Sequence, residues 1–315
     1  MPGRDMVTVP AGVAVLGSSE DHLDGVAAVQ HLARDWFEDE TPQHRTPVRR
    51  FLLDRHPVTN AQFARFANST RYRTVAEQRG FGLVYGPDFW DETPGATWRQ
   101  PTGPNGPTAD QRPDHPVVHI AWPDAAGYAA WSGLRLPTET EWEYAARGPH
   151  GHLWPWGDTW NPDLAACAEH WAGTQINDGP AWRTWWTTHH HTATLPSTRP
   201  VTTTSGTSWC GAAHLAGNVQ EWTATTYHPY NPNRTYIDLY QHISTLGTYK
   251  VLRGGGWMAF RYQTRGAERI AADPTYSNFT TGFRCAADPP AGRKPRPPPW
   301  HADCTSTALV RRLVG

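Results

Sequence analysis

The sequence predicts a loop-rich fold of the α+β class, in which a few short helices and strands are joined by long irregular segments. Its 315 residues include 28 Gly and 29 Pro, and both residue types interrupt regular elements. The 17 Trp supply large apolar surfaces that can pack irregular segments together. Few stretches carry both the periodicity and the caps of a helix.

The first third of the chain indicates strands separated by irregular segments. Residues 6–17 alternate apolar and small side chains, which is typical of a strand or a hairpin. Residues 18–46 are polar and acidic, so we expect a surface loop there. A second strand is predicted over 48–54, and the Gly-, Pro- and aromatic-rich residues 69–114 are predicted to form an ordered loop.

Three helices are indicated by their caps. Thr59 precedes a stretch with an amphipathic period, so it can cap the first helix. A second helix is expected over 124–132, with a Pro at its first turn and Gly133 at its end. Thr138 and Glu141 have the spacing of a capping box, which starts the third helix.

The remaining predicted elements are strands. Residues 116–122 read as a short strand in which His119 is a hydrogen-bonded structural residue. No helix is predicted after Gly148. A late strand is expected over 251–257, and the last core strand over 282–286.

Charge and hydropathy limit the partners. The 28 Lys and Arg nearly balance 29 Asp and Glu, so a net charge of -1 gives no electrostatic reason to expect nucleic acid or an anionic membrane as partner. No apolar run approaches the roughly 20 residues of a membrane helix. No signal-like apolar stretch follows the N-terminus. We therefore expect a cytoplasmic protein, and the oligomeric state stays open.

The cysteines are scattered. Cys167, Cys210, Cys285 and Cys304 form no CxxC or other metal-ligand spacing. We interpret the first three as small buried hydrophobes. A disulfide framework is not expected in a domain of this size.

A series of short segments, taken in order along the chain, is similar to one family. Their combination resembles the formylglycine-generating enzymes and their relatives, which include the sulfoxide synthases of thiohistidine biosynthesis. The segments are Val9–Gly12, Leu16–Ser18, Pro57–Phe63, Asp114–Trp122, Arg135–Arg147, Trp154–Asp158, Gly217–Trp222, Leu252–Gly256 and Gly282–Cys285.

The resemblance implies a C-type-lectin-like fold of the α+β class, with a twisted antiparallel sheet and two main helices. We assign residues 1–288 to this domain. Residues 289–315 are then a proline-rich connector and a C-terminal tail.

The sequence differs from the family at the two catalytic cysteines. The resemblance implies two cysteines that hold copper(I), a soft ion that thiolates suit. At the matching positions this sequence has Ala259 and Thr264, and Gly256 stands in place of a serine. The sequence therefore predicts that the chain does not make formylglycine by the copper route.

The resemblance also implies a calcium site in the segment that begins at Gly217. Backbone oxygens of Gly217 and Val219 and the carboxylate of Glu221 are the candidate ligands. His214 stands where the family has an asparagine, and it is a poor calcium ligand. The alternative is a structural turn in which Glu221 accepts from backbone amides.

Histidines are the candidate ligands for a redox metal. His189 and His191 belong to a run of three histidines in a threonine-rich segment, and His170 lies nearby in sequence. Histidine is a common ligand of iron and copper. Adjacent residues of an extended segment face opposite sides, so at most two of the run can meet one metal. The alternative is a solvated loop.

The stretch after the late strand forms the catalytic groove in the relatives. Arginines there can hold a carboxylate, and a glutamate can accept an amine or bind a metal. The alternative is that these groups form stabilising ion pairs and that the aromatic residues belong to the core. The candidate catalytic residues are Glu268, Arg265 and Arg253, and the candidate substrate-binding residues are Trp257, Tyr262 and Arg269.

The leading hypothesis is an iron- or copper-dependent, O2-using oxidase or oxygenase that acts on a small molecule or an amino-acid-derived intermediate. A non-catalytic lectin-like binding module is the rival, since a fold does not fix a function. A third reading is a non-redox enzyme with Glu268 and a histidine as acid and base.

Overall fold

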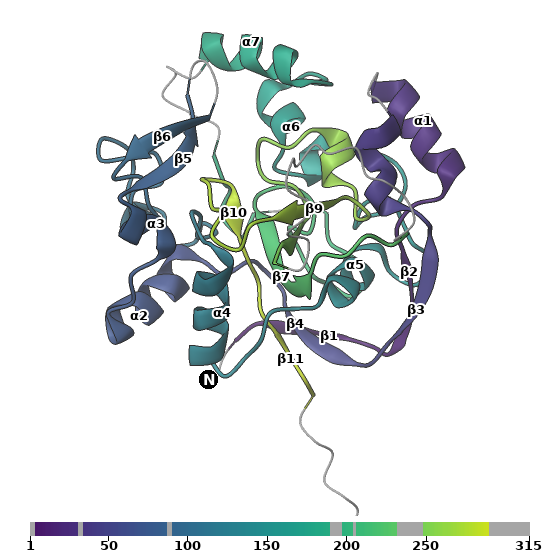
Figure 1. The fold of residues 1–315 in the computed structure, drawn as a ribbon, viewed down its shortest axis with the longest axis horizontal. Helices are drawn as coiled ribbons and strands as arrows, with labels where there is room; N and C mark the ends of the chain where they lie inside the picture. The colour runs from purple at the N-terminus through teal and green to yellow at the C-terminus, as the bar shows by residue number, and fades with distance from the viewer. Residues whose placement is uncertain are drawn as a thin grey trace, which may run out of the picture.

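A computed structural model describes residues 4–30, 34–86, 90–189, 197–203, 206–231 and 248–289 (Figure 1). The histidines at 190 and 191 and nearly all of the predicted connector and tail lie outside these residues. Within the described part of the chain, no helix has the length and apolar character needed to span a membrane.

Among the residues that the structure describes, short strands form four small sheets rather than one large one. The largest has the order β10-β7-β8-β9, and a second has the order β1-β4-β11. Two further pairs are β2-β3 and β5-β6. All pairings are antiparallel except β10 with β7, which is parallel. The bounds are β1 Met6–Val9, β2 Gly12–Leu16, β3 His44–Val48, β4 Phe51–Asp54, β5 Phe81–Tyr85, β6 Trp90–Pro94, β7 Gln220–Thr226, β8 Lys250–Arg253, β9 Arg269–Ala272, β10 Thr281–Gly282 and β11 Ala286–Ala287.

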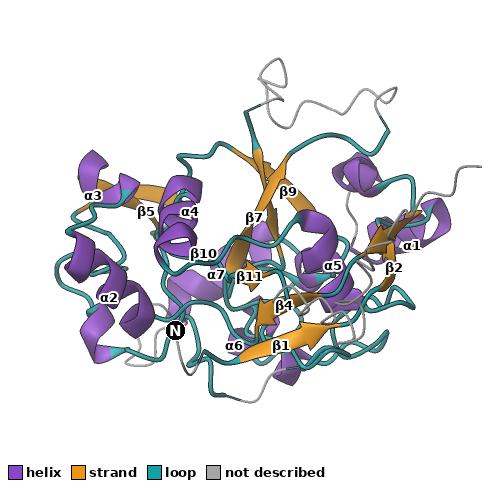
Figure 2. Cartoon of the chain, turned by 90° about the horizontal axis from the view of Figure 1, so that it is seen from below, coloured by secondary structure: helices purple, strands orange, loops and turns teal. Residues whose placement is uncertain are grey.

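The helices are short and surround these sheets (Figures 1 and 2). Long loops connect them, in agreement with the predicted loop-rich α+β fold. The α-helices are α1 Glu20–Gln30, α2 Asn60–Thr70, α3 Val75–Arg79, α4 Trp122–Trp131, α5 Glu139–Arg147, α6 Ala168–Ala172 and α7 Gly179–His189. The 3-10 turns are η1 Arg34–Glu40, η2 Ala109–Gln111, η3 Pro162–Leu164 and η5 Arg261–Thr264.

The helix caps confirm the sequence-based predictions. Thr59 accepts from the backbone of Gln62 and caps α2. Thr138 and Glu141 form the expected capping box at the start of α5, and Gly148 ends that helix with a φ of 69°. Pro lies in the first turn of α4, and Gly133 follows it with a φ of 70°.

In the N-terminal half, one prediction was confirmed in part and two were wrong. Residues 6–17 form strands, as one of the two alternatives predicts, but not a hairpin, because β1 pairs with β4 while β2 pairs with β3. The polar residues 18–46 hold α1, η1 and β3, because a few apolar side chains there, Leu23 and Phe37 among them, are buried and anchor the segment to the core. Residues 69–114 contain α3 and the β5-β6 hairpin rather than one ordered loop.

Two later predictions also need correction. Residues 116–122 do not form a strand, because His119 adopts a φ of 55° and breaks the alternation. His119 is nevertheless buried and hydrogen-bonded through Nε2 to the carbonyl of Pro101, at 2.7 Å, as expected for a structural histidine. Helices do occur after Gly148, since α7 buries Trp182 and Trp186, four residues apart, on one face.

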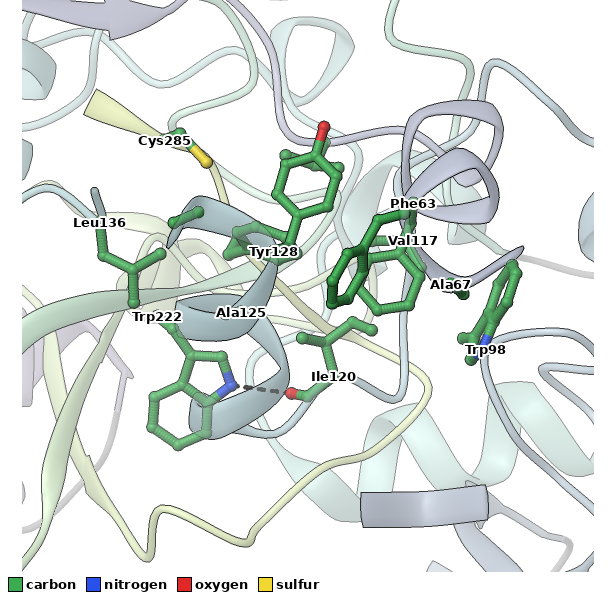
Figure 3. Packing of buried hydrophobic residues seen from close by; sticks show 14 of the residues in the cluster. Phe63, Ala67, Trp98, Val117, Ile120, Ala125, Tyr128, Leu136, Trp222 and Cys285 are labelled. Atoms are coloured by element: carbon green, nitrogen blue, oxygen red, sulfur yellow. Dashed lines mark hydrogen bonds between the residues drawn. The ribbon is translucent and has the colours of Figure 1, made fainter. Parts of the chain in front are cut away.

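An aromatic core joins α2 and α4 to the larger sheet (Figure 3). Phe63 contacts Trp98 and Tyr128 with ring centroids 5.2 and 5.9 Å apart. Trp222 of β7 donates from Nε1 to the carbonyl of Ile120 at 2.8 Å. The polar edge of this buried indole is thus satisfied, and the core fixes β7 against the segment that leads into α4.

Candidate functional site

A groove of about 580 Å³ lies where β8 and β9 meet the β5-β6 hairpin and α7. Figure 1 shows α7 at the top of the molecule and the β5-β6 hairpin below it on the left. The groove is lined by Tyr85, Trp90, Gly179, Trp182, Arg183, Gln220, Tyr249, Leu252, Gly256, Met258, Ala259, Phe260, Gln263, Ile270, Ala271, Ala272, Asp273, Tyr276, Asn278 and Thr280. It therefore contains two positions at which the sequence departs from the family pattern, Gly256 and Ala259, whereas Thr264 is not among the lining residues.

The glycine turn after β8 shapes the floor of the groove. Gly255 has a φ of 66°, and a Cβ there would lie 2.8 Å from both Ala259 Cβ and Gln263 O. These two atoms are therefore at most about 5.6 Å apart. A Cβ on Gly256 would lie 2.6 Å from Thr280 Cβ. A side chain at 256, such as serine, would need Thr280 to move.

The two positions expected to carry thiolates hold a methyl group and a hydroxyl. Ala259 is buried and lines the groove. Thr264 is fully buried, and its hydroxyl donates to the carbonyl of Arg261 at 2.8 Å. Neither side chain is a ligand for a soft cation, so the residues present do not fit copper(I).

Aromatic and amide side chains form the walls. Tyr85 meets Trp90 edge to face at 5.7 Å, and Trp182 lines the α7 side. Asn278 is fixed on the opposite side, because its Oδ1 accepts from the hydroxyl of Thr280 at 2.9 Å and its Nδ2 donates to the hydroxyl of Tyr276 at 2.7 Å. Such a lining suits an organic ligand with apolar parts and a few hydrogen-bonding groups.

The predicted catalytic arginines are engaged in buried ion pairs. Arg253 donates to Glu143 and to the carbonyl of Gly266. Arg265 holds Glu40 through both terminal nitrogens, one of them at 2.8 Å. Both guanidiniums are almost fully buried, so the structure places them in the scaffold behind the floor.

Glu268 belongs to the same buried network. Its carboxylate lies 3.6 Å from Arg265. Burial raises the pKa of Glu268 well above its usual range, and the negative charge of Glu40 adds to the rise. A protonated carboxyl is the form that this environment favours.

The three predicted substrate-binding residues do not share one pocket. Trp257 lines a second, smaller cavity, which shares the side chain of Tyr85 with the groove. Tyr262 and Arg265 line a third cavity, of about 360 Å³, beside α1. Arg269 is buried and holds Glu139 through two hydrogen bonds of 2.8 Å.

The structure places the two predicted histidine ligands that it describes on different helices. His189 ends α7, stacks on Trp185 at 4.6 Å and makes a 2.7 Å hydrogen bond to its carbonyl. His170 lies on the separate helix α6 beside Trp171. His191 lies outside the described residues. Among the residues that are described, no group of three His, Cys, Asp or Glu side chains is arranged to hold a metal ion.

The predicted calcium ligand Glu221 is already satisfied. Both of its carboxylate oxygens accept from Arg284, at 2.6 and 2.7 Å, and Trp142 donates to it at 2.8 Å. Val219 and Glu221 are fully buried, and Gly217 sits at a turn with a φ of 73°. This geometry favours the structural interpretation, with Arg284 rather than backbone amides as the partner of Glu221.

Sequence reasoning missed several groove residues. Tyr249, Tyr276 and Asn278 line it but belong to no motif with a known spacing, and Gln220 lies within the segment Gly217–Trp222 but was not singled out. Trp182 could have been found, because it and Trp186 have the spacing of one helix face.

Comparisons with known proteins agree with this geometry. A family model described as the sulfatase-modifying factor enzyme 1-like domain matches residues 1–289. The formylglycine-generating enzyme of Mycobacterium tuberculosis is 34% identical, over 91% of this chain and 99% of that protein. The hercynine oxygenase of Mycolicibacterium thermoresistibile is 32% identical, over 91% of this chain and 60% of its own length. A mouse protein named inactive C-alpha-formylglycine-generating enzyme 2 is 31% identical, over 91% of this chain and 86% of that protein.

Solved structures support the fold. PvdO from Pseudomonas aeruginosa aligns with a TM-score of 0.58 and 21% identity, over 90% of this chain and 94% of that one. CarF aligns with a TM-score of 0.50 and 18% identity, over 90% and 98% of the two chains. At these identities the likeness concerns the fold alone.

Proposed function

The chain belongs to the sulfatase-modifying factor enzyme 1-like family, and from this premise we propose that it binds an organic ligand in the groove around Ala259 without performing the copper reaction. The observation that carries the proposal is the composition of the groove. Its floor has Ala259 at one of the two thiolate positions, and its walls are aromatic and amide side chains. The other thiolate position is Thr264, which is buried outside the groove lining with its hydroxyl bonded to the carbonyl of Arg261.

Two other thiols among the described residues are poor replacements for the missing pair. Cys167 and Cys285 are fully buried, and burial raises the pKa of the Cys167 thiol to about 12. A thiol with such a pKa stays protonated at neutral pH and is a poor copper ligand. We therefore expect no formylglycine on a sulfatase-type cysteine peptide supplied with copper(I) and O2.

The ligand that fits the groove is a small molecule or an amino-acid-derived compound with an apolar side chain. Trp90, Trp182 and Phe260 offer apolar faces, and Gln220 and Asn278 can orient polar groups. N-acetyl-phenylalaninamide is a suitable probe, because it combines one aromatic ring with two amides.

Met258→Glu tests this proposal, since it places a charge on the groove lining. We expect calorimetry to show at least a tenfold loss of probe affinity, because burying an unpaired carboxylate against the ligand is unfavourable. Val13→Glu is the matched control on an exposed site of β2. Equal affinities for both variants, or no binding by the unmodified protein, would count against the proposal.

The second candidate is the oxidative one, an iron- or copper-dependent oxidase or oxygenase acting on such a compound. It is favoured by the hercynine oxygenase among the relatives and by α7, which lines the groove with Trp182 and ends at His189. Metal analysis of protein purified without a histidine tag, with O2 uptake on turnover, tests it. A metal content below about a tenth of an equivalent, with no gain on reconstitution, would exclude it.

The three readings, a binding protein, an oxidase and a non-redox enzyme, give different results in one assay. A non-catalytic binding protein, the reading that the name of the inactive mouse relative supports, retains the probe unchanged and consumes no O2. An oxidase consumes O2 in proportion to product. A non-redox enzyme converts its substrate without O2.

A further inference from the structure

A second cavity, of about 200 Å³, lies beside the groove and belongs to no part of the proposed function. Its lining comes from the ends of β5 and α7, from the segments around η2, and from the loop before β10. The polar and aromatic lining residues considered below are Asn60, Tyr85, Arg112, Trp186, Trp257 and Phe279.

Aromatic rings form one continuous side of this cavity. Trp257 lies 4.9 Å from Phe279 and 6.0 Å from Trp186, and Trp186 lies 5.7 Å from Tyr85. A dry cavity of about 150 Å³ in another protein is enough for benzene. The present cavity therefore has room for one aromatic ring with small substituents.

The carboxamide oxygen of Asn60 has no partner among the residues that the structure describes. The side chain is only 4% exposed. Its orientation is fixed, because Nδ2 donates to the carbonyl of Arg112 at 2.8 Å and so defines which end is the oxygen. A buried acceptor without a donor is costly, so a ligand hydroxyl or amino group at this point is stabilising.

Arg112 adds a positive charge to the same cavity. Its Nη1 donates to the hydroxyl of Ser197 at 3.0 Å, and within the described ranges no carboxylate forms an ion pair with it. Burial lowers the pKa of Arg112, as expected for a cation without a counter-ion. The neighbouring His115 bonds to Thr198, and burial lowers its pKa, so this imidazole stays neutral at pH 7.

We propose that this cavity binds a single-ring aromatic acid that carries a hydroxyl or amino group. The carboxylate pairs with the guanidinium of Arg112, the donor group bonds to Asn60 Oδ1, and the ring packs against Trp257 and Phe279. The site is separate from the groove and does not depend on the function proposed for it.

Calorimetric titration with 4-hydroxybenzoate tests the proposal. Phenol and benzoate are the comparison ligands, because the first lacks the carboxylate and the second lacks the donor. We expect 4-hydroxybenzoate to bind more than tenfold tighter than either. Arg112→Gln should weaken 4-hydroxybenzoate at least tenfold and change phenol less than twofold, since only the charge is removed.

Arg99→Gln is the matched control, because Arg99 lies on the far side of η2, against the ring of Trp98 and in an ion pair with Glu77. It should change none of the three affinities. No binding at millimolar concentration would overturn the proposal, as would equal losses for both variants. A crystal soaked with 4-hydroxybenzoate that shows only water at Asn60 Oδ1 would also overturn it.

Discussion

Asp39 is an acid held between a tyrosine and an arginine at the end of η1. Its carboxylate accepts from the hydroxyl of Tyr227 at 3.2 Å, and its backbone carbonyl accepts from Arg269 at 3.2 Å. Desolvation raises the pKa of Asp39 to about 7. The positive charge of Arg269 lowers this pKa, and the negative charge of Glu40 raises it further. The folded protein therefore holds a proton here that the unfolded chain releases near its ordinary pKa of 3.8.

This proton makes the free energy of unfolding fall with rising pH. Between about pH 4 and pH 7 the folded state binds more protons at Asp39 than the unfolded state does, so the slope is negative. The full shift corresponds to no more than about 4 kcal/mol. Asp124, whose burial raises its pKa to about 6, contributes with the same sign.

Asp39→Asn should reduce that decline, because an amide carries no charge and still accepts from Tyr227. We expect urea denaturation between pH 5 and 7.5 to show a smaller loss of stability for the variant than for the unmodified protein. Asp110→Asn, at an exposed site, is the control and should leave the slope as it is. A variant with the same slope as the unmodified protein would show that Asp39 is charged throughout.

At the residue scale, the sequence identified the stretch that matters but not the role of each side chain. The losses at Ala259 and Thr264 could be placed because glycines fix the register of the turn before them. The roles of Arg253 and Arg265 could not, because their partners Glu143 and Glu40 lie far away along the chain. Only the tertiary fold brings those charges together.

At the scale of single elements, α5 depends on its N-terminal cap. The hydroxyl of Thr138 accepts from the backbone of Glu141, whose carboxylate accepts from the backbone of Thr138 at 2.9 Å. The helix carries Trp142 and Glu143 into the core, so its first turn positions the buried network.

Thr138→Ala should lower the free energy of unfolding by about 1 kcal/mol, the usual cost of losing such a cap. Guanidinium denaturation measures the change. Thr202→Ala, at an exposed site, is the control and should stay within about 0.5 kcal/mol of the unmodified protein. A loss no larger than that of the control would mean that the cap is not important here.

The pairing of Glu221 on β7 with Arg284 before β11 joins two sheets. Arg284 is fully buried, and it also donates to the carbonyl oxygens of Asp54 and Ala213. Removing one partner of such a pair leaves an uncompensated buried charge, which costs about 3–5 kcal/mol. We expect Arg284→Met to cause a loss of this size in denaturant titrations.

The same pair predicts no dependence on calcium. Arg284 and Trp142 already donate hydrogen bonds to the Glu221 carboxylate, so it is not free to bind calcium. Addition of EDTA should therefore leave the thermal midpoint of unfolding within about 1 °C of its value with calcium. Such a shift corresponds to a change of roughly a few tenths of a kcal/mol in the free energy of unfolding. A larger fall on chelation, restored by calcium alone, would show that these oxygens serve a cation after all.

Element predictions succeeded where a local signal decides and failed where burial decides. The capped helices α2, α4 and α5 were found because caps and periodicity are local. The helix α1 was missed, because it lies in a stretch that is polar and acidic overall and only a few of its side chains, Leu23 among them, enter the core. The segment around His119 reads as a strand but is bent by one residue with a positive φ.

At the scale of the whole molecule, the groove is lined by segments that lie far apart in the sequence. Tyr85 comes from β5, Trp182 from α7, Gln220 from β7 and Ala259 from the turn after β8. No sequence pattern could have indicated this combination, although the family likeness did locate its floor. The scaffold is thus retained while the thiols are absent.

If the scaffold is intact, restoring the thiols should restore copper binding. Ala259 Cβ and Gln263 O are at most about 5.6 Å apart, which brings the start of residue 264 near 259. We expect the double variant Ala259→Cys with Thr264→Cys to bind roughly one equivalent of copper(I), measured by competition with a chromophoric chelator, because two thiolates suit this ion. Each single variant should bind much more weakly.

The unmodified protein, with its own four cysteines, is the control. The contradicting outcome is a double variant that folds with an unchanged thermal midpoint but binds no more copper than the control. In that case the turn no longer has the geometry of the formylglycine-generating relatives, and replacing two side chains is not enough to restore copper binding.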